Sequence, residues 1–560
     1  MPSAEKSATV ISLLCEQVAA RGSQTALLIH RGPEWVPVGW EALLADVRRA
    51  AAALRRRGVE RGDRVVLLSP NRYEWIVADL AIQMAQAVQV PVHASLAGPQ
   101  IVYQIRASGA RLLLISGEEQ AEKLVRHAEL LPAPLAVLAF DACPEAREHL
   151  PLVRFSEVLH DVDEAAAEQV QAEALRLVEA DDLATILFTS GTTGEPKGVM
   201  LSQKNLASNA ASTLEIFGQR EADRRLTWLP FSHIFARTCD LYTWLASGCE
   251  LALADTPESV LANCRQLLPT LLNGVPYFFE KVYRHLVEQS MVDKPGALAA
   301  LFGGKMRMLV SGGAPLPLHV ARCYQQQGML LIQGYGLTES SPVIATETER
   351  HHQFETVGRP IPGVEVKISP EGEILTRGPH VMLGYWNDPT ATAAVLHDGW
   401  LATGDLGEIN AEGYLKITGR KKELIVTAGG KNIAPAHLES LLIEEPLIQQ
   451  ALVVGDARNY LTALIVPDPE ALKAALAANR IQPGDDVLAD ARVRRVFKER
   501  IDQRLAVVSR YEQVQDFVLL DRPFSAERGE VTPTLKLRRN RILANNADAI
   551  AAMYADKPRF

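Results

Sequence analysis

The sequence predicts an α/β protein with a large N-terminal domain, made of two layered α/β subdomains and a small β-rich subdomain, and a smaller α+β C-terminal domain. In the first 350 residues, short apolar runs alternate with helical patterns, as parallel α/β layers require. After about residue 355, short strands separated by glycine-containing turns replace that alternation. From Arg420 a mixed helix and strand pattern resumes. We therefore expect domains at 1–419, with the β-rich subdomain at about 355–419, and at 420–560.

The individual elements can be predicted in order along the chain. Residues 40–57 have an apolar stripe with helical spacing that ends at Gly58, and the apolar run at 64–69 follows as a buried strand. The polar, Ala- and Glu-rich stretch at 160–180 is typical of a surface helix. The other expected elements are a helix at 74–84, strands at 88–92, 111–116 and 134–140, strand pairs at 364–376 and 405–417, a helix near 436–444, strands near 450–454 and 461–466, and a helix near 493–506.

The composition excludes several classes of protein. With 48% hydrophobic and 22% charged residues, the chain is typical of a folded globular protein. Its 58 Lys and Arg against 67 Asp and Glu give a net charge of −9, so we expect no nucleic-acid partner, which would need a broad basic surface. The spacing of the six cysteines matches no zinc site, so we expect them to be reduced thiols that are mostly packed inside the fold. No signal-peptide pattern or long apolar run occurs, so we expect a cytoplasmic protein.

The strongest motif is the segment Phe188-Thr-Ser-Gly-Thr-Thr-Gly-Glu-Pro-Lys-Gly-Val-Met200, which follows an apolar strand. Glycines allow backbone N–H groups to approach an anion, hydroxyls add donors, and Lys197 supplies positive charge. The segment is not a Walker A loop, because the G-x-x-x-x-G-K-[ST] pattern is absent. A flexible Ser/Gly turn is the alternative, but the whole segment favours a phosphate-binding loop.

Two further motifs directly follow apolar strands. Gln333-Gly-Tyr-Gly-Leu-Thr-Glu339 carries a hydroxyl suited to a phosphate oxygen and a carboxylate suited to Mg²⁺, at the sheet edge where α/β proteins bind ligands. Ser311-Gly-Gly-Ala-Pro-Leu316 lacks bulky side chains, so a planar ring could lie against its backbone. A helix cap and a tight turn, respectively, are the simpler structural explanations of these two motifs.

Together with four other segments, these motifs resemble the AMP-forming adenylate-forming superfamily, which includes acyl-CoA synthetases, luciferases and peptide-synthetase adenylation domains. The resemblance covers nearly the whole chain in the family order. The additional segments are Leu229-Pro-Phe-Ser-His-Ile-Phe235, Thr403-Gly-Asp-Leu-Gly407, Gly419-Arg-Lys-Lys-Glu-Leu-Ile425 and Pro533-Thr-Leu-Lys536. The resemblance implies that residues 420–560 form a mobile lid.

The resemblance also implies roles for individual residues. Lys536, His233 and Thr338 would be catalytic, Glu339 and Thr192 would hold Mg²⁺, and Lys422 would be the hinge. Read singly, His233 could be a core histidine, Asp405 a turn residue and Lys536 one charge of a solvated basic run. The residues implied to bind the nucleotide are Thr189, Ser190, Gly191, Thr192, Thr193, Gly194, Lys197, Gly312, Gly313, Ala314, Gly334, Tyr335, Gly336, Thr338, Asp405 and Arg420.

The reaction implied by the resemblance uses a fatty acid, ATP and CoA, with Mg²⁺. The segments 274–283, 378–386 and 420–435 look closest to long-chain fatty acyl-CoA synthetases. Two departures bear on the acyl pocket: Gln203 stands where many relatives carry His, and Arg237 where some bacterial relatives carry a tryptophan gate. Alternatives are a fatty acyl-AMP ligase that serves a carrier protein, and an enzyme that activates an aryl or amino acid. We expect no fused carrier domain, and a long-chain substrate is compatible with peripheral contact at the inner membrane face.

Overall fold

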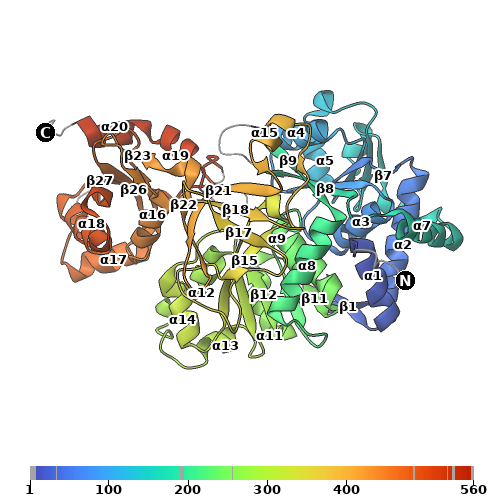
Figure 1. Cartoon of the computed structure of the whole chain (residues 1–560), viewed down its shortest axis with the longest axis horizontal. Coiled ribbons are helices and arrows are strands. Elements are labelled where there is room, and N and C mark those ends of the chain that lie inside the picture. The colour runs from blue at the N-terminus through green and yellow to red at the C-terminus, as the bar shows by residue number, and fades with distance from the viewer. Residues whose placement is uncertain are drawn as a thin grey trace. The chain divides into compact units, whose positions relative to one another are not determined.

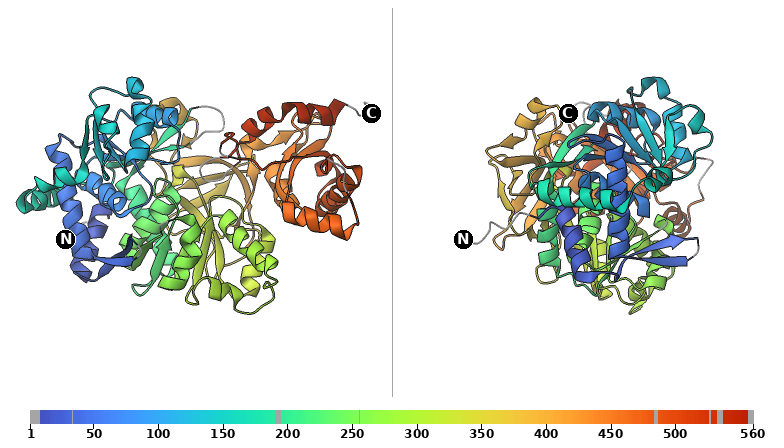
Figure 2. Two further views of the ribbon diagram at one scale, coloured as in Figure 1. Left: turned by 180° about the vertical axis from the view of Figure 1, so that it is seen from behind. Right: turned by 90° about the vertical axis from the view of Figure 1, so that its right-hand side faces the viewer.

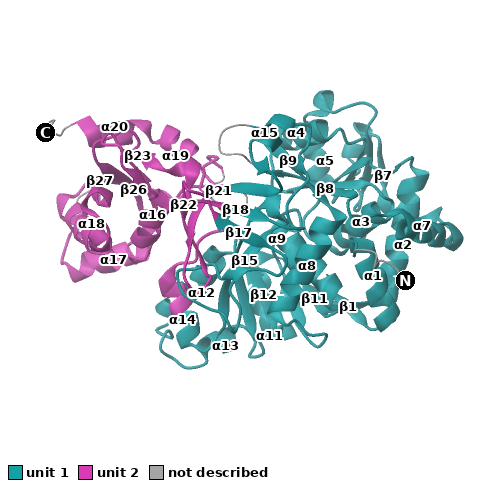
Figure 3. Ribbon diagram, in the orientation of Figure 1, with its two compact units in different colours: residues 1–313, 323–367, 375–403 teal, residues 314–322, 368–374, 404–560 magenta. Residues whose placement is uncertain are grey.

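The computed structural model describes residues 8–32, 34–189, 195–254, 256–482, 486–525, 527–531 and 537–555. The chain forms two compact units (Figure 3). Unit 1 comprises residues 1–313, 323–367 and 375–403, and unit 2 comprises 314–322, 368–374 and 404–560. The predicted domain boundary at 419/420 stays a prediction. Within the described ranges, no helix is long and apolar enough to cross a membrane.

The first sheet of unit 1 has nine strands (Figure 1). Its central strands are parallel, and the strands at each of its two edges pair antiparallel with their neighbours. The strands, in spatial order, are β16 (Arg359–Pro360), β15 (Val343–Thr346), β14 (Leu331–Gly336), β13 (Met308–Gly312), β12 (Leu271–Gly274), β10 (Arg224–Thr227), β11 (Glu250–Leu253), β1 (Thr25–Arg31) and β2 (Glu34–Gly39). Strands β1, β11 and β13 are mainly apolar, as strands covered on both faces usually are, whereas the central β10 carries the buried Arg225, which is ion-paired with Asp240 at 2.8 Å.

The second sheet of unit 1 has eight strands, and the predicted strands at 64–69 and 88–92 lie at its centre. Most neighbours are parallel, but β9 turns back on β8 as an antiparallel hairpin and also pairs with β19. The strands, in spatial order, are β19 (Gly384–Tyr385), β9 (Lys197–Ser202), β8 (Leu183–Thr189), β4 (Val88–Val92), β3 (Arg64–Leu68), β5 (Leu112–Ile115), β6 (Ala136–Ala139) and β7 (Leu152–Arg154).

Helices between and around the sheets bury one large apolar core. The predicted helix at 40–57 is confirmed as α2 (Trp40–Arg56), which packs against α3 (Tyr73–Met84) and α7 (Glu164–Leu177) (Figure 2). The core includes residues of both sheets, such as Leu27 and Leu67. The other helices of four or more residues in unit 1 are α1 (Val10–Arg21), α4 (Gly98–Ser108), α5 (Glu118–Val125), α6 (Phe155–His160), α8 (Gln203–Phe217), the π-helix η3 (Arg237–Tyr242), α10 (Thr243–Ser247), α11 (Val260–Leu267), α12 (Pro276–Glu288), α13 (Ala297–Leu301) and α15 (Pro389–Ala393); α14 (Leu318–Gln326) begins in unit 2.

The β-rich region contains the predicted strand pairs. The first corresponds to β17 (Glu365–Ile368) and β18 (Glu373–Arg377). The long strand β21 (Trp400–Ile409) pairs with β20 (Leu396–His397) in its unit 1 half and with β22 (Leu415–Arg420) in its unit 2 half. The strand pair expected at 405–417 is therefore confirmed as the β21–β22 hairpin.

The rest of unit 2 is a sheet covered on both faces. Strands β25 (Ile448–Val454), β26 (Leu461–Pro467) and β27 (Val514–Leu519) alternate their side chains, so that Val453 faces one core and Leu452 the other. One face is covered by α16 (Pro435–Ile443), α17 (Pro469–Ala478) and α18 (Ala491–Arg504), and the other by α19 (Arg539–Asn545) and α20 (Ala547–Ala555). The small pair β23 (Ile425–Val426) and β24 (Asn432–Ile433) precedes α16. This arrangement confirms the α+β fold expected for the C-terminal part.

Candidate functional site

The predicted phosphate loop connects the hairpin strands β8 and β9 in unit 1. Thr189 ends β8 and is the register partner of Lys197, which begins β9, and the Thr189 hydroxyl donates to the Lys197 carbonyl oxygen at 3.5 Å. Lys197 is exposed. A Cβ on Gly198 would lie 2.8 Å from Ile186 Cγ2, so only glycine allows the hairpin this close packing. Ser190, Gly191, Thr192, Thr193 and Gly194 lie outside the described residues.

The two glycine motifs of the first sheet lie side by side. Gly312 and Gly334 are register partners at the carboxyl ends of the adjacent parallel strands β13 and β14. A Cβ on Gly312 would lie 2.9 Å from the Phe235 ring, so the glycine lets this ring pack against the strand end. Tyr335 is buried in the same strand end, and Gly313 takes a positive φ of 86°. Ala314, the last residue of this predicted adenine site, begins the unit 2 segment 314–322.

After β14 the chain makes a tight turn that presents Thr338 and Glu339. A Cβ on Gly336 would lie 1.7 Å from the Pro342 carbonyl oxygen, so no other residue fits at this position. Thr338–Ser340 forms a single 3₁₀ turn, η5, and the Ser340 hydroxyl accepts a hydrogen bond from the backbone N–H of Leu337 at 2.9 Å. The half-buried side chains of Thr338 and Glu339 therefore stand at the carboxyl edge of the first sheet, as predicted.

Tyr385 connects the two sheets at the candidate site, and sequence reasoning missed it. Its hydroxyl donates a hydrogen bond to Glu339 Oε1 at 2.9 Å, and the Lys197 ammonium lies 5.0 Å from its ring centroid. Burial, and then the negative charge of Glu339, raise the pKa of Tyr385 above its usual value, so the hydroxyl stays a protonated donor. In the sequence, the segment 378–386 indicates only the substrate class, and its glycine–tyrosine pair is the signal that could have identified Tyr385.

The residues around Glu339 fit Mg²⁺ in their chemistry. Mg²⁺ prefers oxygen ligands and usually combines one or two carboxylates with the phosphates of a substrate. Glu339 Oε1 is bonded to a neutral hydroxyl, so the negative charge of the carboxylate is not cancelled there. Among the described residues there is no cluster of three His, Cys, Asp or Glu side chains that could hold a metal without such a substrate. The donor set therefore suits a cation that arrives with a nucleotide.

His233 lies at the start of the short helix α9 (Ile234–Ala236). Its Nδ1 accepts a hydrogen bond from the Phe235 backbone N–H at 3.2 Å, so the proton of the neutral ring is on Nε2. A second histidine, which sequence reasoning missed, lies beside it after β4: the rings of His93 and His233 are 6.3 Å apart. His93 Nδ1 is hydrogen bonded to the Ser232 hydroxyl at 2.8 Å, and burial lowers the pKa of His93 to about 4.

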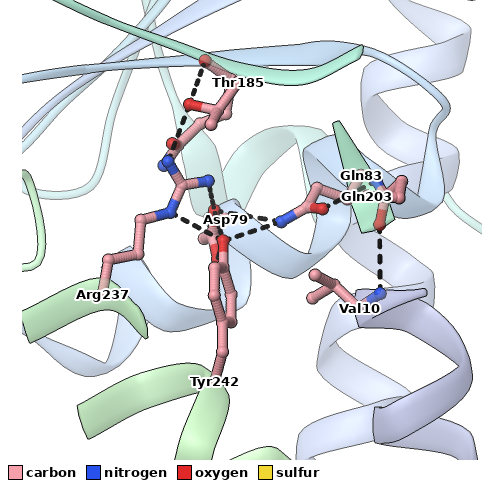
Figure 4. A network of polar contacts seen from close by, with 8 residues as sticks. Val10, Asp79, Gln83, Thr185, Gln203, Arg237 and Tyr242 are labelled. Atoms are coloured by element: carbon pink, nitrogen blue, oxygen red, sulfur yellow. Dashed lines mark hydrogen bonds and ion pairs between the residues drawn. The ribbon is translucent and has the colours of Figure 1, made fainter. Parts of the chain in front are cut away.

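Arg237, which directly follows α9 in the chain, belongs to a buried polar network of unit 1 (Figure 4). Arg237, the residue at the tryptophan-gate position, is ion-paired with Asp79 at 2.6 Å and also donates to Thr185 and Tyr242 at 2.8 and 2.7 Å. Both members of the ion pair are 0% exposed.

Gln203, the second departure, belongs to the same network. Its Nε2 donates to Gln83 Oε1 at 2.9 Å, and its Oε1 accepts the Val10 backbone N–H at 3.0 Å. Gln83 in turn donates to the Tyr242 hydroxyl at 3.0 Å, which connects Gln203 to the Arg237 ion pair. The two departures seen in the sequence are therefore parts of one connected structure.

In unit 2, the predicted ribose-binding residues form a pair. Asp405 and Arg420 are register partners in the β21–β22 hairpin, and their side chains form an ion pair at 2.9 Å. The neighbouring Lys421 is ion-paired with Glu373 at 2.8 Å, and the other carboxylate oxygen of Glu373 accepts the Gly404 backbone N–H at 2.9 Å. The predicted hinge Lys422 is exposed in the 3₁₀ turn η6 (Lys421–Glu423). Lys536 lies outside the described residues.

Unit 1 thus contains two α/β sheets with the predicted anion-binding residues at their strand ends, and most of the smaller unit 2 follows it in the chain. Residues 14–386 match the family described as AMP-binding enzyme, and residues 422–558 match the AMP-binding enzyme C-terminal domain. The chain belongs to the AMP-binding enzyme family, as its sequence motifs predicted.

Individual relatives agree with this assignment. The long-chain-fatty-acid–CoA ligase FadD15 of Mycobacterium bovis is 34% identical over 93% of this chain and 92% of its own length. The long-chain-fatty-acid–CoA ligase ACSBG1 of mouse is 26% identical over 98% of this chain and 86% of its own. The structure of ATP-bound MatB from Rhodopseudomonas palustris matches with a TM-score of 0.77 at 24% identity, over 97% and 99% of the two chains, which confirms the adenylate-forming fold. At this level the chain is an AMP-forming acid–CoA ligase.

Proposed function

We propose that this enzyme is a long-chain fatty acid–CoA ligase that uses ATP and CoA. The observation that carries the proposal is the convergence of Lys197 and Glu339 on Tyr385. In this arrangement, Lys197 beside the tyrosine ring would bind phosphate oxygens, and Glu339 at the tyrosine hydroxyl would hold Mg²⁺. Activation of a carboxylate by a nucleoside triphosphate needs this combination of charges.

In the first step, a fatty carboxylate oxygen attacks the α-phosphorus of ATP, the α–β phosphoanhydride bond breaks, and pyrophosphate leaves. Lys197 and the loop 189–194 would bind the departing phosphates, and Thr338 the α-phosphate. Glu339 and Thr192 would hold Mg²⁺, which when bound neutralises charge on the triphosphate. Lys536 would neutralise the charge that develops between the carboxylate and the α-phosphate, while Asp405 and Arg420 bind the ribose.

In the second step, the CoA thiolate attacks the acyl carbon of the mixed anhydride, and AMP leaves. Residues 420–560 would turn about Lys422, which removes Lys536 from the site and admits the thiol. Since adenylation makes AMP a good leaving group, the chain needs no nucleophile of its own.

Two observations support a long-chain substrate. The two relatives named above carry that activity in their names, at 34% and 26% identity. In addition, the apolar residues Phe231 and Phe235 stand two positions before and after His233, which suits an apolar acyl chain better than a charged amino acid.

The test is pyrophosphate release from ATP with fatty, aryl and amino acids, each with and without CoA. We expect release with C12–C18 fatty acids and acyl-CoA formation when CoA is present. Lys197→Met should reduce release strongly, whereas Lys204→Met, which removes an exposed lysine from α8 next to the same hairpin, should not. Turnover of aryl or amino acids only, or transfer to a carrier protein and not to CoA, would replace the proposal by the corresponding alternative.

A further inference from the structure

The Tyr385 side chain contacts both charged groups of the candidate site. Its hydroxyl is 2.9 Å from Glu339 Oε1, and its ring centroid is 5.0 Å from Lys197 Nζ. Lys197 belongs to β9 of the second sheet, and Glu339 follows β14 of the first sheet. The tyrosine therefore connects groups that come from different sheets and from distant parts of the sequence.

The backbone around Tyr385 is held at several points, so its side chain starts from a defined position. Tyr385 is the register partner of Val199 in the β19–β9 pair, and its backbone N–H donates to the Thr392 hydroxyl at 2.9 Å. On one side, the Met382 N–H donates to the Glu339 carbonyl oxygen at 2.9 Å, and on the other the Trp386 N–H donates to the Gly198 carbonyl oxygen at 2.7 Å. The segment is thus bonded to the backbones of both functional elements.

A neutral donor at this position has a chemical advantage over a cation. If Lys197 paired directly with Glu339, each would cancel the charge that the other needs for its ligand. Within the described part of the chain, no ion pair joins these two residues; Glu339 accepts from the Tyr385 hydroxyl, and Lys197 lies near the Tyr385 ring. A hydrogen bond to one carboxylate oxygen fixes the direction of the other, as the outer partners of metal ligands do.

We propose that Tyr385 is a positioning residue, which holds one oxygen of Glu339 so that the other is directed to the divalent cation that accompanies the nucleotide. The inference rests on the proposed function, because it takes Glu339 as the metal-binding carboxylate. It adds a residue of the segment 378–386 to the site and assigns it a role in metal affinity. The ring contact with Lys197 is a separate property, which a phenylalanine at the same position would retain.

The experiment compares Tyr385→Phe with Tyr73→Phe. Tyr73 is a matched control because its hydroxyl also donates to a carboxylate, Asp46 Oδ2 at 2.7 Å, away from the site. Mn²⁺ binding to the full-length protein saturated with α,β-methylene-ATP, which cannot be cleaved at the reacting bond, is measured from the electron paramagnetic resonance signal of free Mn²⁺. Binding of the same analogue in EDTA is measured by calorimetry.

We expect Tyr385→Phe to weaken Mn²⁺ binding about 10- to 100-fold, as loss of an outer partner of a metal ligand typically does. Analogue binding in EDTA should stay within about twofold, since the ring beside Lys197 remains, and Tyr73→Phe should match the wild type. In a Glu339→Gln background, Tyr385→Phe should have no further effect on Mn²⁺ affinity.

Unchanged Mn²⁺ affinity in Tyr385→Phe, or an equal loss of metal-free binding, would refute the positioning role. If the wild-type protein itself binds neither the analogue nor Mn²⁺ with it, the proposed function fails instead, so the two failures are distinguishable.

Discussion

Removal of Arg237 should destabilise unit 1 strongly, because it leaves the buried Asp79 carboxylate without its cation. Both side chains are 0% exposed and their ion pair is 2.6 Å long. Breaking a buried pair by removing one partner typically costs about 3–5 kcal/mol. Replacing both partners by apolar residues avoids the uncompensated charge. We therefore expect Arg237→Met to lose about 3–5 kcal/mol and the double variant Asp79→Leu, Arg237→Met less than about 2 kcal/mol.

The loss in Arg237→Met should also depend on pH, with a definite sign. Burial raises the pKa of Asp79, and Arg237 opposes that shift, so without Arg237 the folded protein holds the proton to a higher pH. The unfolded chain releases this proton near its ordinary pKa of about 4. Because the folded state then binds more protons than the unfolded state, stability falls as pH rises above that value. The loss should be larger at pH 8 than at pH 5.

Urea unfolding followed by tryptophan fluorescence measures these changes in the relevant unit. All seven tryptophans lie in unit 1, so the signal reports on that unit. If the double variant lost as much stability as the two single variants together, the two residues would not be energetically coupled. A loss below about 1 kcal/mol in Arg237→Met would likewise refute the cost assigned to an unpaired buried carboxylate.

Three other predictions concern separate parts of the molecule. Gly336→Ala should destabilise unit 1 and abolish nucleotide binding, since its Cβ would lie 1.7 Å from the Pro342 carbonyl oxygen; wild-type thermal unfolding and binding would contradict this. The folded pKa of His93 is about 4, below its value of about 6.5 in an unfolded chain, so the unfolded state binds more protons as the pH falls between these values. The wild type should therefore lose up to about 3 kcal/mol of stability as pH falls from about 6.5 to 4. His93→Gln should flatten that dependence in urea titrations between these pH values. Lys536→Ala should cripple adenylation but spare thioester formation from supplied acyl-adenylate, and equal loss of both half-reactions would exclude the proposed role.

Much of the fold could be predicted from local patterns. The helix at 40–57 has an apolar stripe and a terminal glycine, and α2 (Trp40–Arg56) confirms it. The motif around Gly336 lies at a strand end, as predicted, because glycines that follow an apolar run are typical of the point where a buried strand gives way to a turn. The two-residue strand β19 (Gly384–Tyr385) was not predicted, since so short an element has no periodicity and depends on pairing with β9.

The candidate site was predictable in its motifs and not in its contacts. The sequence predicts Lys197 and Glu339 as phosphate and metal residues, but their shared contact with Tyr385 depends on how the two sheets meet. His93 carried no motif, and its bond to Ser232 joins segments far apart in the chain. Arg237 was visible as a departure from related sequences, yet its partner Asp79 could not be known before α3 and the π-helix were placed together.

The sequence by itself determined the class of fold, the order of the motifs and the chemical types of the functional groups, because these depend on local conformational preferences and on residue chemistry. Only the tertiary structure decided which groups face each other. It paired Tyr385 with Glu339, His93 with Ser232, and Arg237 with Asp79. The physical reason is that a hydrogen bond or ion pair requires atoms to lie within about 3 Å, and packing of the two sheets and their helices sets that distance.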